Sequence, residues 1–234
     1  MKLDKDKEVI SDMFDSIAPS YDALNHILSL GIDKLWRKKV AKMIRKSGAH
    51  TILDVATGTG DLAITIAKKA PLTTITGVDF SKGMLAVGVE KVKKADMSKQ
   101  INLEYGDALN LEFKDNNFDS TTIGFGVRNF SNLRAGTAEM CRVTRKGGAL
   151  YVIELSMPQN GFIRWSYNIY FKRILPFIGR FRSKSDFAYN YLPESVSQFL
   201  AAEEYSTLLK EVGFDSVKVY PLTFGVATLY VAKK

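Results

Sequence analysis

Short apolar, β-branched runs alternate with amphipathic stretches along the middle of the chain. The runs predict buried strands, and the stretches, with apolar residues at spacings of three and four, predict helices. We expect strands at 51–56, 73–79, 101–105, 118–125 and 149–154, and helices from 61, at 82–94 and at 132–143. Strands and helices that alternate through short loops predict a parallel sheet with helices on both faces.

The two ends of the chain extend this pattern. Residues 5–17 predict a helix that stops at Ala18-Pro19-Ser20, and residues 35–45 predict a basic amphipathic helix. A helix at 203–212 is expected to end at Gly213, and the runs 217–220 and 227–232 predict a pair of strands at the sheet edge. We therefore expect one domain over 1–234, with an N-terminal helical segment at 1–48.

Residues 156–198 interrupt the alternation. Aromatic residues such as Trp165 and Phe171 are interleaved there with basic residues such as Arg173, Arg180 and Arg182. The segment is too rich in aromatics for a disordered loop. A lid on the core, a tunnel lining, a helix in the headgroup layer of an anionic membrane and a surface for single-stranded RNA all fit this composition.

The stretch TILDVATGTGD at 51–61 predicts a strand, a glycine turn and a helix. Gly58 and Gly60 lack Cβ atoms, so backbone N–H groups can come close to a ligand. Such a turn at the end of the first strand is typical of a nucleotide site. The pattern Gly-x-Gly-x-x-Ala, with Asp79 about twenty residues further on, fits a dinucleotide cofactor.

Three features favour S-adenosyl-L-methionine instead. Asp54 lies at the end of the first strand, where it can reach an amino-acid group directly or through water. Asp107 and Ala108 follow the third strand, where a carboxylate and an N–H can hold an adenine edge. A terminal strand pair closes the chain, and too few residues remain for a large separate substrate domain. These acids and Thr59 also have purely structural interpretations. Asp54 and Asp79 could cap helices, and Asp107 and Thr59 could be ordinary turn residues.

Charge and cysteine content narrow the function classes. The net charge of +8 suggests an acidic partner, although a basic soluble surface explains it equally well. Cys141 is the single cysteine, so no internal disulfide forms, as in a reducing cytosol. With only two histidines, we expect no metal site. We expect neither a signal peptide nor a membrane span, and a cytoplasmic location.

Four stretches carry a resemblance to a known family. They are FDSIAPSYD at 14–22 with Leu24-Asn25, LDVATGTGD at 53–61, FGVRN at 125–129 and YNYLPES at 189–195. The chain resembles class I S-adenosylmethionine-dependent methyltransferases and, nearly end to end, the menaquinone/ubiquinone biosynthesis C-methyltransferases. The resemblance implies a Rossmann-like α/β fold with a mostly parallel seven-stranded sheet, helices on both faces and a terminal antiparallel strand.

The resemblance also assigns cofactor positions. Those of the family match Thr59, Asp79, Asp107 and Ala108 here, in addition to Asp54, Gly58 and Gly60 of the turn region. A family contact that is often serine is Gly124 in this chain, so only a backbone contact carries over. Ala56 replaces the first glycine of the general pattern, which we expect to be tolerated.

The reaction implied is methylation of a ring carbon of demethylmenaquinol, giving menaquinol. A ubiquinone precursor or another phenolic small molecule is the alternative substrate. The site must align the carbon with the methyl group and favour the phenolate. Arg128 would stabilise charge, and Asn129 and Tyr21 would hydrogen-bond the quinol oxygens; a surface turn and core packing are the structural alternatives. Asp22, His26 and a water are equally open as the base.

The implied partner is a prenylated quinol, which resides in a bilayer. We therefore expect contact with the inner face of the cell membrane, through residues 156–198, and no nucleic-acid partner. A homodimer is left open by the sequence.

Overall fold

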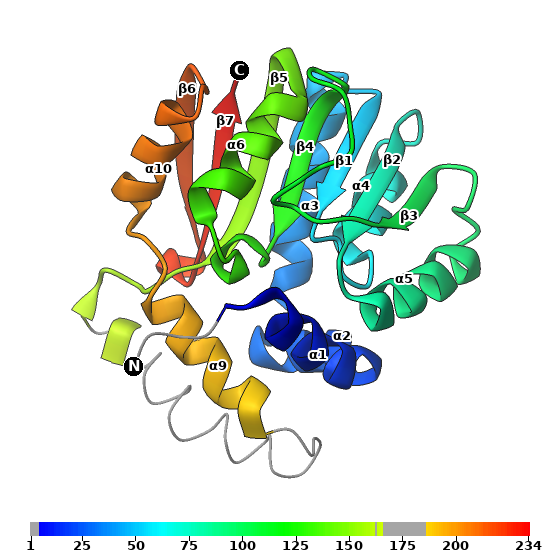
Figure 1. Ribbon diagram of the computed structural model, residues 1–234. Coiled ribbons are helices and arrows are strands. Elements are labelled where there is room, and N and C mark those ends of the chain that lie inside the picture. Colours follow the sequence, from blue (N-terminus) through cyan, green and yellow to red (C-terminus); the bar gives the residue numbers. More distant parts are fainter. Residues whose placement is uncertain (1–4, 162, 166–185) are drawn as a thin grey trace.

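A seven-stranded sheet forms the centre of the computed structural model, which describes residues 5–161, 163–165 and 186–234 (Figure 1). The strand order is β3-β2-β1-β4-β5-β7-β6. The strands are β1 (Thr51–Val55), β2 (Thr74–Asp79), β3 (Ile101–Tyr105), β4 (Phe118–Gly124), β5 (Thr144–Leu155), β6 (Ser216–Leu222) and β7 (Ala227–Lys233). Only β7 runs antiparallel to its neighbours, so the predicted sheet with its reversed terminal strand is confirmed.

Helices cover both faces of the sheet, as the alternating pattern predicted. α3 (Asp33–Ser47) and α4 (Asp61–Lys69) pack in one apolar cluster with β1, β5 and β7, together with a residue of α5 (Lys82–Lys94). α6 (Leu133–Val143) and α10 (Ala202–Glu211) pack in a second cluster on the opposite face. Each cluster contains fully buried side chains, such as Ile52 in the first and Leu150 in the second.

Helix starts follow the capping residues that the sequence offers. Ser81 accepts a hydrogen bond from the Met84 N–H at the start of α5, and Asn132 accepts one from Ala135 at the start of α6. The α3 helix ends at Gly48, whose φ of 69° is left-handed. These capping contacts explain why the predicted helix bounds agree closely with the observed ones.

One strand boundary was wrong. The sequence predicted that β5 begins at Ala149, after a turn at Lys146–Gly148, but the strand begins at Thr144. The pairing of β4 with β5 shifts between Phe118 and Ser120, so the glycine pair is accommodated as an irregularity inside the strand. Gly147 has a φ of 78°, which lets the strand bend there and resume pairing.

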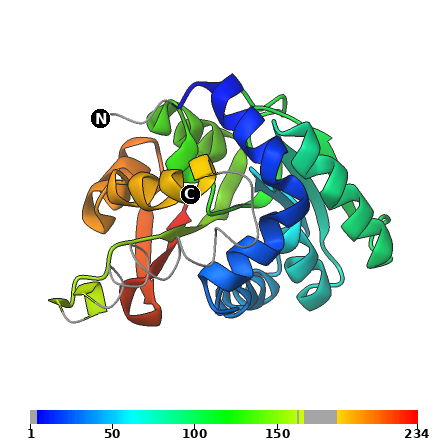
Figure 2. The ribbon, with the colours of Figure 1, turned by 90° about the horizontal axis from the view of Figure 1, so that it is seen from below.

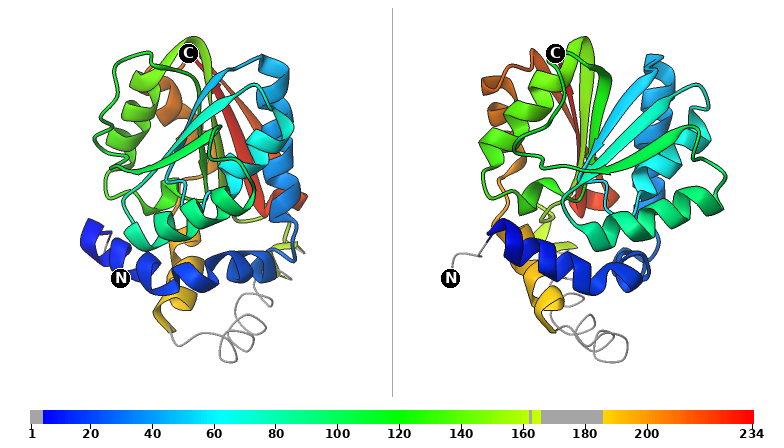
Figure 3. Two further views of the ribbon diagram at one scale, coloured as in Figure 1. Left: turned by 90° about the vertical axis from the view of Figure 1, so that its right-hand side faces the viewer. Right: turned by 45° about the vertical axis from the view of Figure 1, so that its right-hand side comes forward.

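A third layer lies across the carboxyl ends of the parallel strands (Figures 2 and 3). It contains α1 (Lys7–Ile17), the 3₁₀ turn η1 (Ala18–Ser20), α2 (Tyr21–Leu28) and α9 (Asp186–Ser197). α1 packs on α5 and on α9. The predicted break at Pro19 is therefore a short 3₁₀ turn, and the segment before β1 covers the edge of the sheet where ligands bind in such folds.

Candidate active site

The chain turns after β1 at the two glycines, as the sequence predicted. Gly58 and Gly60 have φ values of 56° and 78°. A Cβ built on Gly58 meets no atom within 4 Å, so the space over this residue is open to a ligand. Ala56 also has a positive φ, 49°, which costs an alanine about 1 kcal/mol. The turn thus keeps its shape although alanine replaces the first glycine.

Asp79 lies at the end of β2, directly beside this turn. Its carboxylate accepts hydrogen bonds from the Gly58 N–H at 2.8 Å and from the Ser81 N–H at 2.9 Å. Burial raises the pKa of Asp79 to about 6, although the backbone donors oppose this effect. A carboxylate oxygen has two lone pairs, so Asp79 can accept further hydrogen bonds from ligand hydroxyls.

Asp54 lies beneath the turn and supports it. The residue is 1% exposed, and its two carboxylate oxygens accept hydrogen bonds from the hydroxyls of Thr57 at 2.7 Å and Thr122 at 2.6 Å. Burial raises its pKa to about 6. Neither of the two pockets described below has Asp54 in its lining. The geometry therefore gives this acid a direct role in holding the turn to β4.

The N-terminal segment contacts the loops after β1, β2 and β3 through one charged side chain each. Lys7 pairs with Asp107 at 2.7 Å. Asp15 accepts hydrogen bonds from the Ser81 hydroxyl and, at 2.9 Å, from the Gly83 N–H.

The third contact involves the glycine turn itself. Asp22 accepts a hydrogen bond from the Thr59 hydroxyl at 2.5 Å and pairs with Lys91 of α5. Lys91 also pairs with Asp61 at 2.5 Å, the first residue of α4. Asp22, which the sequence left open as a base, thus lies in a partly exposed ion cluster that fastens α2 to the turn. Asp107 likewise acts as a turn residue, because it accepts from the Leu109 N–H at 2.9 Å.

A pocket, here called the strand-end pocket, lies between these loops and the N-terminal helices. Of the residues predicted for the site, Gly58, Asp79, Gly124, Tyr21 and Asn129 line it. The remaining wall is mostly apolar and consists of Phe14, Ala56, Phe80, Met84, Phe125, Gly126 and Phe130. The other predicted residues of these loops do not line the pocket; they are Thr59 and Gly60 after β1 and Asp107 and Ala108 after β3. A Cβ at Gly124 would meet only Leu62, at 3.4 Å. Compared with the serine that often occupies this position in the family, Gly124 therefore lacks a hydroxyl group but leaves the packing intact.

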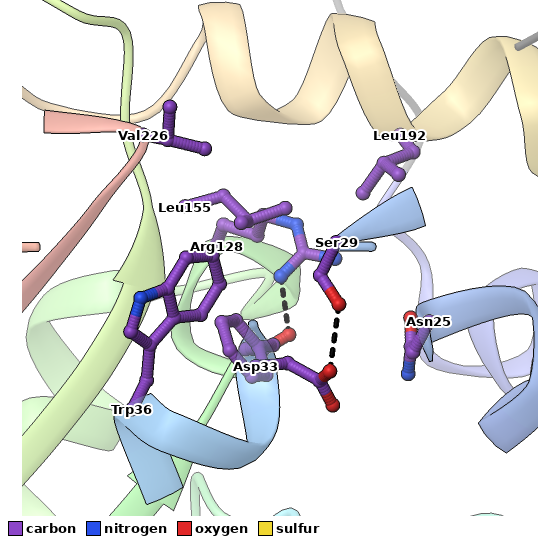
Figure 4. A pocket seen from close by; sticks show the side chains of 9 residues that line it. Asn25, Ser29, Asp33, Trp36, Arg128, Leu155, Leu192 and Val226 are labelled. Atoms are coloured by element: carbon purple, nitrogen blue, oxygen red, sulfur yellow. Dashed lines mark hydrogen bonds between the residues drawn. The ribbon is translucent and has the colours of Figure 1, made fainter. Parts of the chain in front are cut away.

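Figure 4 shows a second pocket, here called the apolar chamber. It shares Phe125 with the first pocket. Its apolar wall combines Trp36 of α3 with Leu155, Leu192 and Val226. Its polar lining residues are Asn25, Ser29, Asp33 and Arg128. Trp36 is fixed by a hydrogen bond from its indole N–H to the Thr223 hydroxyl at 2.9 Å. The chamber is therefore lined by residues from the N-terminal, central and C-terminal parts of the chain.

Arg128 is buried and already paired. Its Nη1 group donates to Glu154 at 2.7 Å and to the carbonyl oxygen of Phe125, and its Nε donates to Ser195 at 3.3 Å. Burial alone would lower the pKa of Arg128, but the charge of Glu154 raises it above the ordinary value. Among the hydrogen bonds between described residues, none uses its Nη2 group. The guanidinium thus remains charged, and one amino group remains available to a ligand.

Asn129 and Tyr21 complete the polar part of the site. The Asn129 side-chain oxygen accepts a hydrogen bond from the Tyr191 hydroxyl at 3.0 Å, so its NH₂ group is the part left to donate. Burial raises the pKa of Tyr21, and nearby Arg128 and Asn25 only partly offset this, so its hydroxyl stays protonated near neutral pH. The side chains of Tyr191 and Ser195 tie α9 to the Arg128-Asn129 turn η2 (Val127–Asn129).

Sequence reasoning missed Glu154 and the α2–α3 side of the chamber. Glu154 is 1% exposed and lies in the apolar strand β5. A lone acid inside such a run is a signal in itself, because a buried charge needs a partner. Ser29, Asp33 and Trp36 carried no comparable signal, since only the folded chain brings them to Arg128.

Curated relatives match almost the whole chain. A demethylmenaquinone methyltransferase of Bacteroides fragilis is 43% identical over 230 residues, which cover 98% of this chain and 94% of the relative. One of Chlorobaculum tepidum is 45% identical over 236 residues, with the same coverage of both chains. A ubiquinone/menaquinone biosynthesis C-methyltransferase of Geobacter sulfurreducens is 43% identical over 234 residues, covering 100% of this chain and 91% of the relative.

Solved structures agree with the fold. A SAM-dependent methyltransferase from Aquifex aeolicus superposes with a TM-score of 0.59 at 17% identity, covering 82% of this chain and 87% of that one. The [4+2]-cyclase SpnF superposes with a TM-score of 0.66 at 17% identity, covering 96% and 95%. The fold thus also carries chemistry other than methyl transfer. The model of the ubiE/COQ5 methyltransferase family matches residues 1–234, and with relatives above 40% identity over nearly the full chain, this protein belongs to that family.

Proposed function

We propose that this protein transfers a methyl group from S-adenosyl-L-methionine to a ring carbon of demethylmenaquinol, giving menaquinol. The relatives named demethylmenaquinone methyltransferase support this substrate, and the two cited above match 98% of this chain. The relative named for ubiquinone as well as menaquinone biosynthesis keeps a ubiquinone precursor as the second candidate.

One observation carries the proposal: the strand-end pocket and the apolar chamber meet at Phe125. The first has a carboxylate and open glycine backbone, and the second has an apolar wall with donors at one end. Phe125 itself has a φ of 63°, a rare conformation that is typical of ligand sites. Adjacent sites of these two characters suit a polar cofactor on one side and an aromatic ring on the other.

The strand-end pocket fits the proposed cofactor. Asp79 would accept hydrogen bonds from the ribose hydroxyls, and the open space over Gly58 leaves room beside them. Phe80, Met84 and Phe130 form apolar walls that suit a nucleoside. When bound, the cofactor supplies an electrophilic methyl group on a sulfonium. The protein has no comparable electrophile of its own, so its remaining task is to orient and activate the ring.

Three residues that line the two pockets carry hydrogen-bond donors. Arg128 lines the apolar chamber, and Asn129 and Tyr21 line the strand-end pocket. A quinol hydroxyl that loses its proton becomes a phenolate, and its charge makes the neighbouring ring carbon nucleophilic. Fixed donors aimed at that oxygen stabilise the phenolate without reorganisation. Glu154 compensates the charge of Arg128. Arg128 would therefore stabilise the phenolate as an oriented hydrogen-bond donor more than as a free positive charge.

The test is an assay with the cofactor and three reduced acceptors, read by mass spectrometry. The acceptors are demethylmenaquinol, a ubiquinone precursor of equal tail length and a tailless phenol. We expect a mass gain of one methyl group on the ring of demethylmenaquinol and the highest kcat/KM with it. A higher kcat/KM with the ubiquinone precursor would make that precursor the assigned substrate. Methylation of the tailless phenol alone would contradict the assignment of a quinol substrate.

We also propose that residues 156–198 bring the protein to a membrane surface that holds the substrate. No helix among residues 5–161, 163–165 and 186–234 combines the length and apolar character needed to cross a bilayer. Trp165 is 61% exposed, as suits a side chain that enters a headgroup layer. Most of the predicted amphipathic stretch, including Arg173, Arg180 and Arg182, lies outside the described residues.

Flotation with liposomes tests this contact. We expect binding to anionic liposomes that weakens with salt and falls when Arg173, Arg180 and Arg182 are changed to glutamate, since each basic residue near such a surface contributes about 1 kcal/mol. Neutral liposomes are the control. Full activity on a long-tailed quinol in detergent, without binding to either liposome, would leave a lid or a tunnel as the role of the segment.

A further inference from the structure

A third cavity, here called the lateral groove, lies beside the apolar chamber. Its lining comes from three stretches of the chain, which are 155–160 with Arg164, 196–203 and 219–230. The groove offers about 530 Å³ of free space, against about 40 Å³ in the chamber. The chamber is therefore too small for a ring together with a long substituent, whereas the groove is large enough for an extended chain.

Three separate elements line both the chamber and the groove. Leu155, at the end of β5, lines both cavities. On α9, Leu192 lines the chamber and Val196 lines the groove, and residues four apart lie on one face of a helix. In the β6–β7 connection, Gly225 of the groove directly precedes Val226 of the chamber. The three chamber residues lie on the side away from the start of α3 (Figure 4), so the groove continues the chamber on that side.

Apolar side chains of the groove range from buried to fully accessible. Val196 and Tyr230 are buried, Leu200 and Val219 are exposed, and Phe224 is 79% exposed. Exposed apolar side chains that gather in one patch mark a contact site, whereas single ones do not. The groove thus offers an apolar wall that leads from the chamber to the outside of the protein.

The polar side chains of the groove do not prevent an apolar chain from lying there. The Ser156 hydroxyl donates to the carbonyl oxygen of Gly225 at 2.8 Å, and Arg164 Nε donates to the carbonyl oxygen of Pro158 at 2.9 Å. The charged residues Arg164 and Glu203 are exposed, so their charges can stay in water. A chain in the groove therefore does not leave these groups buried without partners, which would be costly.

We propose that the lateral groove binds the isoprenoid tail of the substrate while the quinol ring lies in the apolar chamber. This inference rests on the function proposed above, which gives the ring a prenyl tail. The chamber meets the strand-end pocket at Phe125, where the cofactor would lie, and meets the groove at Leu155. The tail therefore leaves past Leu155. Because Phe224 is exposed in the groove, the outer part of a long tail can remain in the bilayer.

The test variant combines Leu200→Asn with Phe224→Asn. Both side chains are exposed, so their loss should change the fold little, and asparagine tolerates the φ of 57° at Phe224. KM is measured for quinols with one, two and three isoprene units and divided by the wild-type KM for the same quinol. Partitioning of the tail into detergent cancels in this ratio.

We expect the KM ratio to rise with tail length, about tenfold from one isoprene unit to three, because two apolar contacts are lost. The effect should fall on KM more than on kcat. The matched control is Leu72→Asn, since Leu72 is 82% exposed and lies outside the groove, between α4 and β2. Its KM ratio should not vary with tail length.

Photolabelling locates the tail without turnover. The probe is demethylmenaquinone with a three-isoprene tail that ends in a diazirine, and labelled peptides are mapped by mass spectrometry. We expect labels on 196–203 and 219–230 that unlabelled long-tailed demethylmenaquinone suppresses. A KM ratio that does not depend on tail length, or labelling that the competitor leaves unchanged, would overturn the tail site. A wild type that methylates no quinol would overturn the proposed function, and the labelling would then decide the groove by itself.

Discussion

The strand-end pocket and the apolar chamber are built in opposite ways. The strand-end pocket takes its key polar groups, Gly58 and Asp79, from loops at the ends of β1 and β2, adjacent in one sheet. The chamber draws its lining from residues between 25 and 226, on α2, α3, η2, β5, α9 and the β6–β7 connection. Under the proposed function, the cofactor, which many enzymes share, needs only one sheet edge, whereas the particular substrate needs the assembled tertiary structure.

The two regions also treat charge differently. Asp54 and Asp79 have pKa values raised to about 6 by burial, and hydroxyl and backbone donors surround them. In the chamber each buried charge has an opposite charge beside it: Arg128 with Glu154, and Asp33 with Arg37. We therefore expect cofactor affinity at the strand-end pocket to depend on pH. We expect the stability of the chamber to depend on each charged residue keeping its partner.

The largest effect should come from breaking the Arg128–Glu154 pair. Glu154→Leu leaves a buried guanidinium without its carboxylate, which should lower the free energy of unfolding by about 3–5 kcal/mol. Urea denaturation measures this. In the paired variant Arg128→Leu with Glu154→Leu, most of the stability should return, because no unpaired charge remains. If the single variant were as stable as the wild type, the pair would not hold the chamber together.

The same paired variant separates stability from chemistry. Without Arg128 it should lose about 10²–10³-fold in kcat, the usual effect of removing one oriented donor at a developing oxyanion. Its cofactor affinity, measured by calorimetry, should match the wild type, because Arg128 lines the chamber and not the strand-end pocket. A variant that loses mainly cofactor affinity would place Arg128 in cofactor binding.

Asp79→Ala should weaken cofactor binding, since hydrogen bonds to a charged acceptor contribute about 1.5–3 kcal/mol each. The wild type should also lose affinity as the pH falls below about 6, where Asp79 takes up a proton. The stability of the ligand-free protein should change in the opposite direction. Because the folded pKa of Asp79 and Asp54 exceeds the unfolded value, their contribution to stability rises as the pH falls from about 6 to about 4.

Titration calorimetry across pH checks the affinity, and urea denaturation of the ligand-free protein across pH checks the stability, with Asp79→Asn as the control for both. The amide keeps the size of the side chain and removes its titration, so the affinity of that variant should vary less with pH. An unchanged affinity in Asp79→Ala would remove this residue from the cofactor site.

The smallest effect should come from the N-terminal segment. Asp22→Asn removes the ion pair with Lys91 and keeps an oxygen for Thr59. Partly exposed pairs contribute about 1 kcal/mol at most, so cofactor affinity should fall no more than about fivefold and less at high salt. Arg134→Ala, in an exposed pair with Glu211, is the matched control and should have no effect. A larger loss in Asp22→Asn would mean that the segment orders the glycine turn.

The sequence by itself determined the sheet, the helices that cover its faces and the sheet edge at which the strand-end pocket lies. Periodicity identified the strands because their apolar runs are local, and Ser81, Asn132 and Gly48 set helix ends through contacts with near neighbours. Gly58 and Asp79 were identifiable for the same reason: a turn and the end of a strand are local features. The start of β5 was missed because a strand irregularity depends on its partner, β4.

Only the tertiary structure decided what the remaining polar residues do. Asp22 fits a base equally well in sequence, but Lys91 and Thr59, from distant helices and turns, engage its carboxylate. Glu154 acquires its role only when β5 brings it to Arg128, and Ser29 and Asp33 acquire theirs only when α2 and α3 close one side of the chamber. Pairing and burial arise between segments far apart in the chain, and no local pattern encodes which segments will meet.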